Sequence, residues 1–187
     1  MIKFAIIEGV SGAGKDTVIK ELVKRHPKQF IKLPSLTSRK MRENETQGNP
    51  YYHVSRIEFE NKIQTGEVFE HTIMTRDGEY RGMSSQIIDN LLSQNFILLK
   101  DCDHVGILAL KKKYGEQSIL SFFLDVPKSE VHKRLIARGE TEIEKRLADF
   151  DLYKELILPY CDHIVSNIDL NKCVTTIALL ILKEHPQ

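Results

Sequence analysis

The sequence has few cysteines: Cys102, Cys161 and Cys173 are the three among 187 residues, and no two of them have C-x-x-C spacing. Disulfide frameworks use cysteines in pairs, and structural zinc sites use closely spaced ligands. An odd number without that spacing therefore argues against both kinds of site. We expect three buried thiols.

The sequence also lacks an excess of charge and any long apolar run. Its 27 Lys and Arg residues are balanced by 26 Asp and Glu, so it has none of the polybasic character that attracts nucleic acid or anionic lipid. No apolar stretch approaches the roughly 18 residues of a membrane span. We therefore expect no nucleic-acid partner and no membrane partner, and any anion-binding site must be local.

No secretory signal is expected either. The apolar N-terminal stretch is short, and Glu8 and a glycine-rich loop follow it at once, without a small-residue cleavage site. We expect a cytoplasmic protein whose 187 residues form a single folding unit.

Short apolar segments alternate with longer segments of helical period, which predicts a parallel sheet between helices. Strands of such a sheet are buried on both sides, so they are apolar along most of their length. The segments that fit are 4–8, 30–34, 96–100, 119–124 and 163–166. Helices are expected at 16–25, 85–93, 105–113, 129–138 and 170–184. The fold class is thus α/β, with a five-stranded parallel sheet covered by helices on both faces.

Residues 35–84 have a different composition, rich in charged and turn-forming residues. Ser55-x-x-Glu58 is a capping box that opens a short helix, and Thr75-Arg-Asp-Gly indicates the turn of a hairpin. We expect this segment to form a small mixed α/β insert beside the core.

The segment Gly9-Val-Ser-Gly-Ala-Gly-Lys15 has the phosphate-binding pattern G-x-x-x-x-G-K, with an apolar strand before it and a helical segment after it. In such loops the backbone N–H groups converge on a phosphate, and the lysine adds a positive charge on the outer phosphates. We therefore expect the P-loop NTPase type of fold and a site for a nucleoside triphosphate. The candidate ligands are Gly9, Ser11, Gly12, Ala13, Gly14, Lys15, Asp16 and Thr17.

Asp16 stands where this pattern usually has a serine or threonine that contacts magnesium. A carboxylate close to three phosphates is tolerable mainly if a divalent cation lies between them, so we expect Asp16 to hold Mg²⁺. Two alternatives stay open: Asp16 caps the helix without any metal role, or the hydroxyl of Thr17 serves the metal.

Further motifs, spread over nearly the whole chain, resemble those of the guanylate kinases. The family pattern S-x-T-T-R-x-x-R-x-x-E appears as Ser35, Thr37, Arg39, Arg42 and Glu45. The patterns Y-x-F-V-S and G-E-F-x-E appear as Tyr51-Tyr-His-Val-Ser and Gly66-Glu-Val-Phe-Glu70. The family's L-D-I-D and V-N-D-D are similar to Leu-Lys-Asp101-Cys-Asp103 and Val165-Ser-Asn167-Ile-Asp.

The resemblance implies an enzyme that phosphorylates GMP or dGMP with ATP and Mg²⁺, as a monomer or a homodimer. It implies that Arg39, Arg42 and Tyr51 hold the GMP phosphate, although Arg39 to Arg42 alone would be a solvated charge run. Glu70 would accept the adjacent N–H donors of guanine, which adenine lacks. Ser35 and Asp103 would also contact the base and Asp101 would join Asp16 at the metal, although either Asp101 or Asp103 could instead cap a helix. Asn167 would touch ATP or merely shape a turn.

By the same resemblance, Lys15, Arg134, Arg138 and Arg146 are the catalytic cations. Arg134 and Arg138 share one helix face, which binds phosphates or pairs with surface acids. The acceptor phosphate has a second pKa of about 6, so no general base is required and the histidines are read as structural or surface residues. The implied parts are a core of 1–34, 85–135 and 147–187, an acceptor lobe of 35–84 and a short helical lid of 136–146.

The sequence departs from the family pattern at four places: Asp16, Pro50, the segment Tyr80-Arg81-Gly82-Met83-Ser84, and a shorter lid. Arg81 replaces a phosphate-binding tyrosine and could still bind the acceptor phosphate. Met83 replaces a base-contacting hydroxyl and cannot donate a hydrogen bond, which loosens the expected guanine selectivity.

Three other functions compete with this interpretation. A related P-loop kinase could act on ribosyl bisphosphate or a deoxynucleoside monophosphate, since ribosyl bisphosphate kinases also carry G-K-D. A guanylate-kinase-like module could bind partners without catalysis, but such modules usually lose the lysine that this chain keeps as Lys15. A GTPase switch is disfavoured because Ser166-Asn-Ile-Asp169 lacks the lysine of N-K-x-D.

Overall fold

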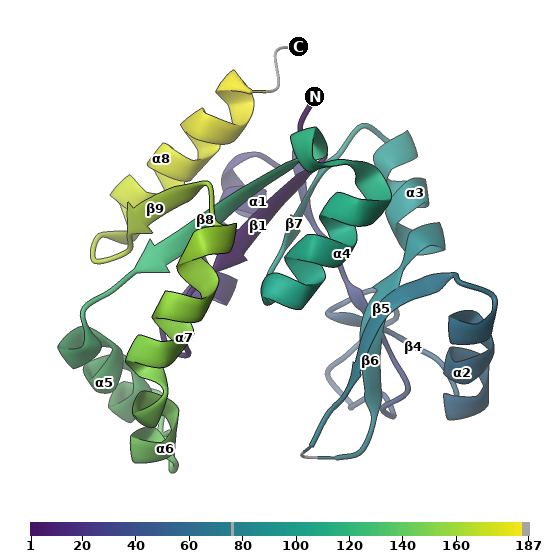
Figure 1. The fold of residues 1–187 in the computed structure, drawn as a ribbon, viewed down its shortest axis with the longest axis horizontal. Helices are drawn as coiled ribbons and strands as arrows, with labels where there is room; N and C mark the ends of the chain where they lie inside the picture. Colours follow the sequence, from purple (N-terminus) through teal and green to yellow (C-terminus); the bar gives the residue numbers. More distant parts are fainter. Residues whose placement is uncertain (76, 185–187) are drawn as a thin grey trace.

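A computed structural model describes residues 1–75 and 77–184 (Figure 1). Its centre is a parallel five-stranded sheet in the order β2-β7-β1-β8-β9. The strands are β1 (Phe4–Glu8), β2 (Phe30–Lys32), β7 (Ile97–Lys100), β8 (Ile119–Asp125) and β9 (His163–Ser166). The predicted α/β class and its five parallel strands are confirmed.

Helices cover both faces of this sheet, because side chains of β1 alternate between two apolar clusters. Ala5 and Ile7 pack with α1 and α8, and Phe4 and Ile6 pack with α3 and α4. These helices are α1 (Lys15–Arg25), α8 (Leu170–Lys183), α3 (Ser85–Ser93) and α4 (His104–Tyr114). Within the part of the chain that the structure describes, no helix is both long and apolar enough to cross a bilayer.

The cysteines are free, and the expectation of three buried thiols holds for one of them. Cys173 is fully buried in α8, whereas Cys102 and Cys161 are partly exposed. Cys102 and Cys161 follow the ends of β7 and of the last 3-10 helix (Leu158–Tyr160), where the chain leaves the core.

The insert forms a second sheet of its own, in the order β4-β3-β6-β5, with one parallel and two antiparallel pairings. Its elements are β3 (Ser35–Thr37), β4 (Tyr51–His53), α2 (Arg56–Gln64), β5 (Val68–Ile73) and β6 (Tyr80–Ser84). Leu36, Phe59 and Val68 form its separate apolar cluster. The mixed α/β insert is therefore confirmed, and β5 and β6 pair as a hairpin, although its predicted turn includes Arg76, which lies outside the described residues.

The predicted short helical lid of 136–146 overlaps α6 (Ile143–Ala148), whereas α7 (Phe150–Ile157) was not predicted. They follow α5 (Lys128–Ala137), and Leu147 and Phe150 anchor them in the main core. In Figure 1, α5 and α6 lie at the lower left and the insert lies at the lower right, both beyond the carboxyl ends of the parallel strands. Ligands of open α/β sheets bind at this edge.

The capping box at the start of α2 yields a stability prediction. The Ser55 side chain accepts a hydrogen bond of 3.1 Å from the Glu58 N–H, and removing such a cap costs about 1 kcal/mol. We expect Ser55→Ala to lower the free energy of unfolding by that amount in urea denaturation. Ser93→Ala is the control, because its hydroxyl bonds to the Asn90 carbonyl within α3; equal losses in both variants would contradict the capping role.

Candidate active site

The phosphate loop connects β1 to α1 and depends on glycine. Gly9, Gly12 and Gly14 have φ angles of 151°, 88° and 95°, which side chains with a Cβ atom rarely adopt. A Cβ atom on Gly14 would also lie 2.7 Å from Nδ2 of Asn167. Lys15 folds back over the loop, and its ammonium donates to the Gly9 carbonyl.

Asn167 and Arg134, both singled out from the sequence, meet at the carbonyl oxygen of Ala13. The buried Asn167 amide donates to it at 2.7 Å, and Arg134 donates at 3.3 Å. Arg134 also donates to the Asn167 carbonyl at 2.8 Å and pairs with Glu130 at 3.1 Å. Asn167 therefore supports the loop, while the Arg134 guanidinium lies against it.

Two cavities flank the loop. One of about 480 Å³ is lined by Lys15, Asp16, Thr17, Arg134, Arg138 and Asn167, among others. The other, of about 530 Å³, is lined by Ser11, Lys15, Arg146 and Tyr153, among others. Arg146 donates to the Ser11 hydroxyl at 3.4 Å and pairs with Glu140 at 2.6 Å. The four cations predicted to be catalytic are thus brought together around one loop.

Glu8 is a site residue that the sequence analysis missed. It is 2% exposed and accepts a hydrogen bond of 2.7 Å from the Tyr153 hydroxyl. Burial raises the pKa of Glu8 to about 7, against the opposing effects of Lys15 and of the hydrogen bonds from Tyr153 and Gly9. The available signal was a glutamate that ends an apolar strand directly before the loop. Glu8 couples the base of the loop to α7.

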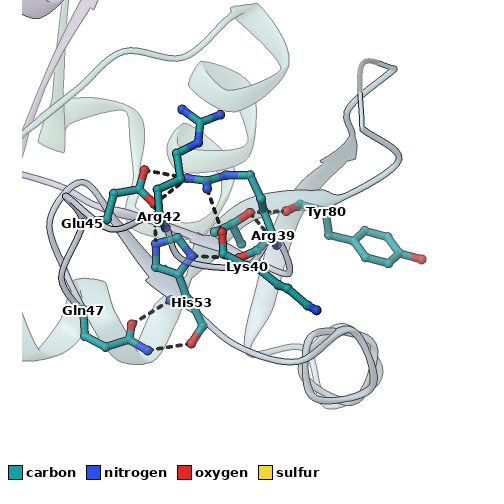
Figure 2. A network of polar contacts seen from close by, with 8 residues as sticks. Arg39, Lys40, Arg42, Glu45, Gln47, His53 and Tyr80 are labelled. Atoms are coloured by element: carbon teal, nitrogen blue, oxygen red, sulfur yellow. Dashed lines mark hydrogen bonds and ion pairs between the residues drawn. The ribbon is translucent and has the colours of Figure 1, made fainter.

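A second group of cations lies in the insert, around Arg39 (Figure 2). One Arg39 nitrogen contacts both oxygens of Glu45, at 2.7 and 2.9 Å, and the Arg42 backbone N–H donates to the same carboxylate at 2.9 Å. The hydrogen bond from Arg39, followed by that from Arg42, lowers the pKa of Glu45. His53 contacts the Arg39 carbonyl at 2.8 Å. Arg39 is therefore held in place rather than solvated, whereas the Arg42 side chain extends away from this network (Figure 2).

Arg39 and Arg81 both lie beside the ring of Tyr51. Their guanidinium carbons are 5.6 and 5.3 Å from its centroid. Among the described residues, neither Nε atom has a hydrogen-bond partner, although both are buried. Because buried N–H groups are almost always paired, these two donors indicate an anion-binding site.

A third group, at the end of β7, contains Ser35, Glu70 and Asp103. Burial and then the negative charge of Asp103 raise the pKa of Glu70, while the positive charge of Lys100 opposes them. Lys100 donates to the Ser35 hydroxyl at 2.6 Å. Asp103 accepts from the Gly106 N–H at 3.1 Å and so caps α4. The sequence analysis had treated Lys100 as part of a strand.

Asp16 lies in the first turn of α1 but makes no capping bond in the described structure, since Gly14 is the cap residue. Its carboxylate pairs with the Lys32 ammonium at 2.6 Å. Burial acts to lower the pKa of Lys32, but the hydrogen bond to Asp16 and the charges of Asp101 and Asp16 outweigh it and raise that pKa. Asp16 and Asp101, the two carboxylates predicted to bind the metal, therefore both stabilise the charged form of Lys32.

Hard oxygen donors of this kind suit Mg²⁺, which is held by one or two carboxylates together with waters and substrate phosphates. Among residues 1–75 and 77–184 there is no cluster of three or more His, Cys, Asp or Glu able to hold a metal. The carboxylates of Asp16 and Asp101 are oxygen donors of the kind that Mg²⁺ accepts.

The sequence profile described as guanylate kinase matches residues 1–184. The guanylate kinase of Helicobacter pylori is 37% identical over 172 residues, which cover 89% of this chain and 80% of that protein. The guanylate kinase of Idiomarina loihiensis is 30% identical over 189 residues, covering 96% and 86%.

Solved structures show the same fold. The guanylate kinase of Anaplasma phagocytophilum superposes with a TM-score of 0.68 at 21% identity, covering 100% of this chain and 87% of that one. A shikimate kinase of Acinetobacter baumannii in complex with shikimate superposes with a TM-score of 0.53 at 15% identity, covering 100% and 97%.

Buried Glu8 makes stability depend on pH. Its pKa is about 7 in the folded chain and about 4.5 when exposed, so the folded state holds its proton more tightly. Below pH 4.5 the Glu8 carboxyl is protonated in both the folded and the unfolded chain, and its burial does not lower the free energy of unfolding. As the pH rises from 4.5 towards 7, the unfolded chain releases this proton more readily, so the free energy of unfolding falls. Glu8→Gln has no such proton to lose, so we expect its free energy of unfolding to rise by roughly 3 kcal/mol relative to that of the wild type across this pH interval. Urea denaturation at several pH values measures this change. Glu144→Gln, on an exposed side chain, is the control. A difference between Glu8→Gln and the wild type that stays constant with pH would contradict the raised pKa of Glu8.

Proposed function

This chain belongs to the guanylate kinase family of nucleoside monophosphate kinases, and from that premise we propose that it phosphorylates GMP or dGMP by in-line transfer from Mg²⁺-ATP. The observation that carries the proposal is the pair of anion sites at one edge of the parallel sheet. One surrounds Lys15 and the phosphate loop, and the other surrounds Tyr51 with the buried, unpaired Nε atoms of Arg39 and Arg81.

The loop is the donor site. Its backbone N–H groups and Lys15 bind the ATP phosphates, and the cavity lined by Arg134, Arg138 and Asn167 receives the rest of the nucleotide. Arg138 is exposed and the Arg146 side chain is 44% exposed, so both can turn towards the phosphates when ATP binds. Arg146 would then leave its ion pair with Glu140.

The acceptor phosphate binds between Arg39 and Arg81, with Tyr51 and Arg42 completing the site. Glu45 fixes the plane of the Arg39 guanidinium, which presents its remaining N–H groups to a phosphate. Arg81 takes over from the tyrosine of the family pattern as a stronger, charged donor.

Glu70, Ser35 and Asp103 bind the base. The Glu70 carboxylate is partly buried and receives no hydrogen bond from the described residues, so it is well suited to the paired N–H donors of guanine. Adenine has no such pair of donors, so its binding would leave the Glu70 carboxylate desolvated and unpaired.

The acceptor oxygen is already ionised at neutral pH, so the protein must align two anions and exclude water. Lys15, Arg134, Arg138 and Arg146 supply the positive charge. Residues 35–84 act as the acceptor lobe and 136–146 as the lid, and both close on the core of 1–34, 85–135 and 147–187. Asp16 and Asp101 would hold Mg²⁺, which neutralises charge on the outer ATP phosphates when bound.

An acceptor panel tests the function. Purified protein with ATP and Mg²⁺ is assayed for ADP formation with GMP, dGMP, AMP, CMP, UMP and ribose 1,5-bisphosphate. We expect turnover with GMP and dGMP, loss of it in Lys15→Met, and no effect of Lys24→Met, whose side chain is 78% exposed. Turnover of the sugar phosphate alone would overturn the guanine assignment, and a folded but inactive chain would indicate a binding module.

The metal role of Asp16 is tested by its magnesium dependence. We expect Asp16→Ala to require roughly tenfold more Mg²⁺ for half-maximal turnover, because a carboxylate ligand is lost. Asp16→Ser, which restores the hydroxyl of the family pattern, should recover part of the affinity. Lys32→Met is the control for loss of the ion pair; an unchanged magnesium dependence in Asp16→Ala would rule out the metal role.

A further inference from the structure

Met83 leaves the proposed base site without one of its hydrogen-bond donors. It is 2% exposed and belongs to an apolar cluster with Leu98 and Ile107. It pairs in register with Glu70 across β5 and β6. A thioether accepts hydrogen bonds weakly and donates none, so a different residue must supply any donor to the far edge of the base.

Lys100 is placed to be that donor. It ends β7, pairs with Ile6 of β1 in the middle of the parallel sheet, and is 8% exposed. The three residues before it are apolar and buried. Lysine is almost never buried without a partner, so its ammonium group at this position requires an explanation beyond strand packing.

The side-chain hydrogen bond of Lys100 leads to the proposed base site. Its ammonium donates to the Ser35 hydroxyl at 2.6 Å, which uses one of its three N–H donors. Its positive charge acts on the Glu70 carboxylate and on the Cys102 thiol, lowering the pKa of each against the larger effect of burial. The ammonium group is therefore hydrogen-bonded to one residue of the proposed base site, Ser35, and is near enough to Glu70 to act on its carboxylate electrostatically.

This arrangement is complementary to one edge of a 6-oxopurine. Guanine presents the acceptor O6 beside the donors N1–H and N2–H₂, whereas adenine presents an amino donor at C6. A carboxylate matches the guanine donors, and an ammonium group matches O6. The amino group of adenine would instead point its hydrogens at a buried cation.

We propose that Lys100 reads the 6-keto oxygen of the acceptor purine, directly or through the Ser35 hydroxyl, and so makes the site selective for 6-oxopurine monophosphates. This rests on the proposed function, and it assigns to Lys100 the donor that Met83 cannot provide. Ser35, turned by Lys100 so that its oxygen accepts the Lys100 N–H, keeps its own hydrogen for the ligand.

The test compares GMP, IMP and 6-thioguanosine 5′-monophosphate in the wild type and in Lys100→Met, a change of similar length without charge. The thio analogue keeps both donors of guanine but replaces O6 with sulfur, a weak acceptor. We expect kcat/KM for GMP and IMP to fall roughly tenfold to hundredfold, with little change for the thio analogue. The preference for GMP over the analogue should therefore collapse, and Lys100→Arg, which keeps N–H donors, should restore part of it.

Lys112→Met, on an exposed lysine of α4, is the matched control, and thermal unfolding verifies that each variant is folded. An equal loss on all three acceptors would show a purely structural role for Lys100, and no loss on any would show no role; either result overturns the inference while the proposed function stands. A wild type inactive on GMP would instead remove the proposed function, and this inference with it.

Discussion

The carbonyl oxygen of Ala13 is where three parts of the molecule meet. The Asn167 amide reaches it from the end of β9, and the Arg134 guanidinium reaches it from α5. The glycines of the phosphate loop allow this close approach, since a Cβ atom on Gly14 would collide with Asn167. The shape of the phosphate loop therefore depends on hydrogen bonds from segments that lie 121 and 154 positions away in the chain.

The nearly neutral chain pairs several cations of the loop region and of the insert with its own carboxylates. Arg39 pairs with Glu45, Arg134 with Glu130, and Arg146 with Glu140. Lys32 likewise forms an ion pair with Asp16. These pairs relieve repulsion between like charges. The partly exposed pairs of Arg134 and Arg146 contribute little stability of their own, whereas the side chains of Arg39 and Glu45 are each only 11% exposed.

The parallel strands could be predicted because burial on both faces makes them continuously apolar, and the loop because its glycine spacing follows from backbone geometry. The bounds of α6 and the presence of α7 could not, since such short segments form through the packing of Leu147 and Phe150 on the core. Glu8 and Lys100 were missed because a charged residue after an apolar run resembles a strand end. Their partners Tyr153 and Ser35 lie 145 and 65 positions away, which no local pattern reveals. The roles assigned to individual site residues remain predictions.

The junction between the insert and the core has a mechanical consequence. β6 ends at Ser84, α3 begins at Ser85, and the Ser84 hydroxyl caps that helix, so no slack separates the two elements. Ile88 of α3 is itself embedded among core side chains. Because no linker separates β6 from α3, the second sheet cannot rotate without moving α3. Such a rotation would therefore change the packing of α3 on one face of the central sheet.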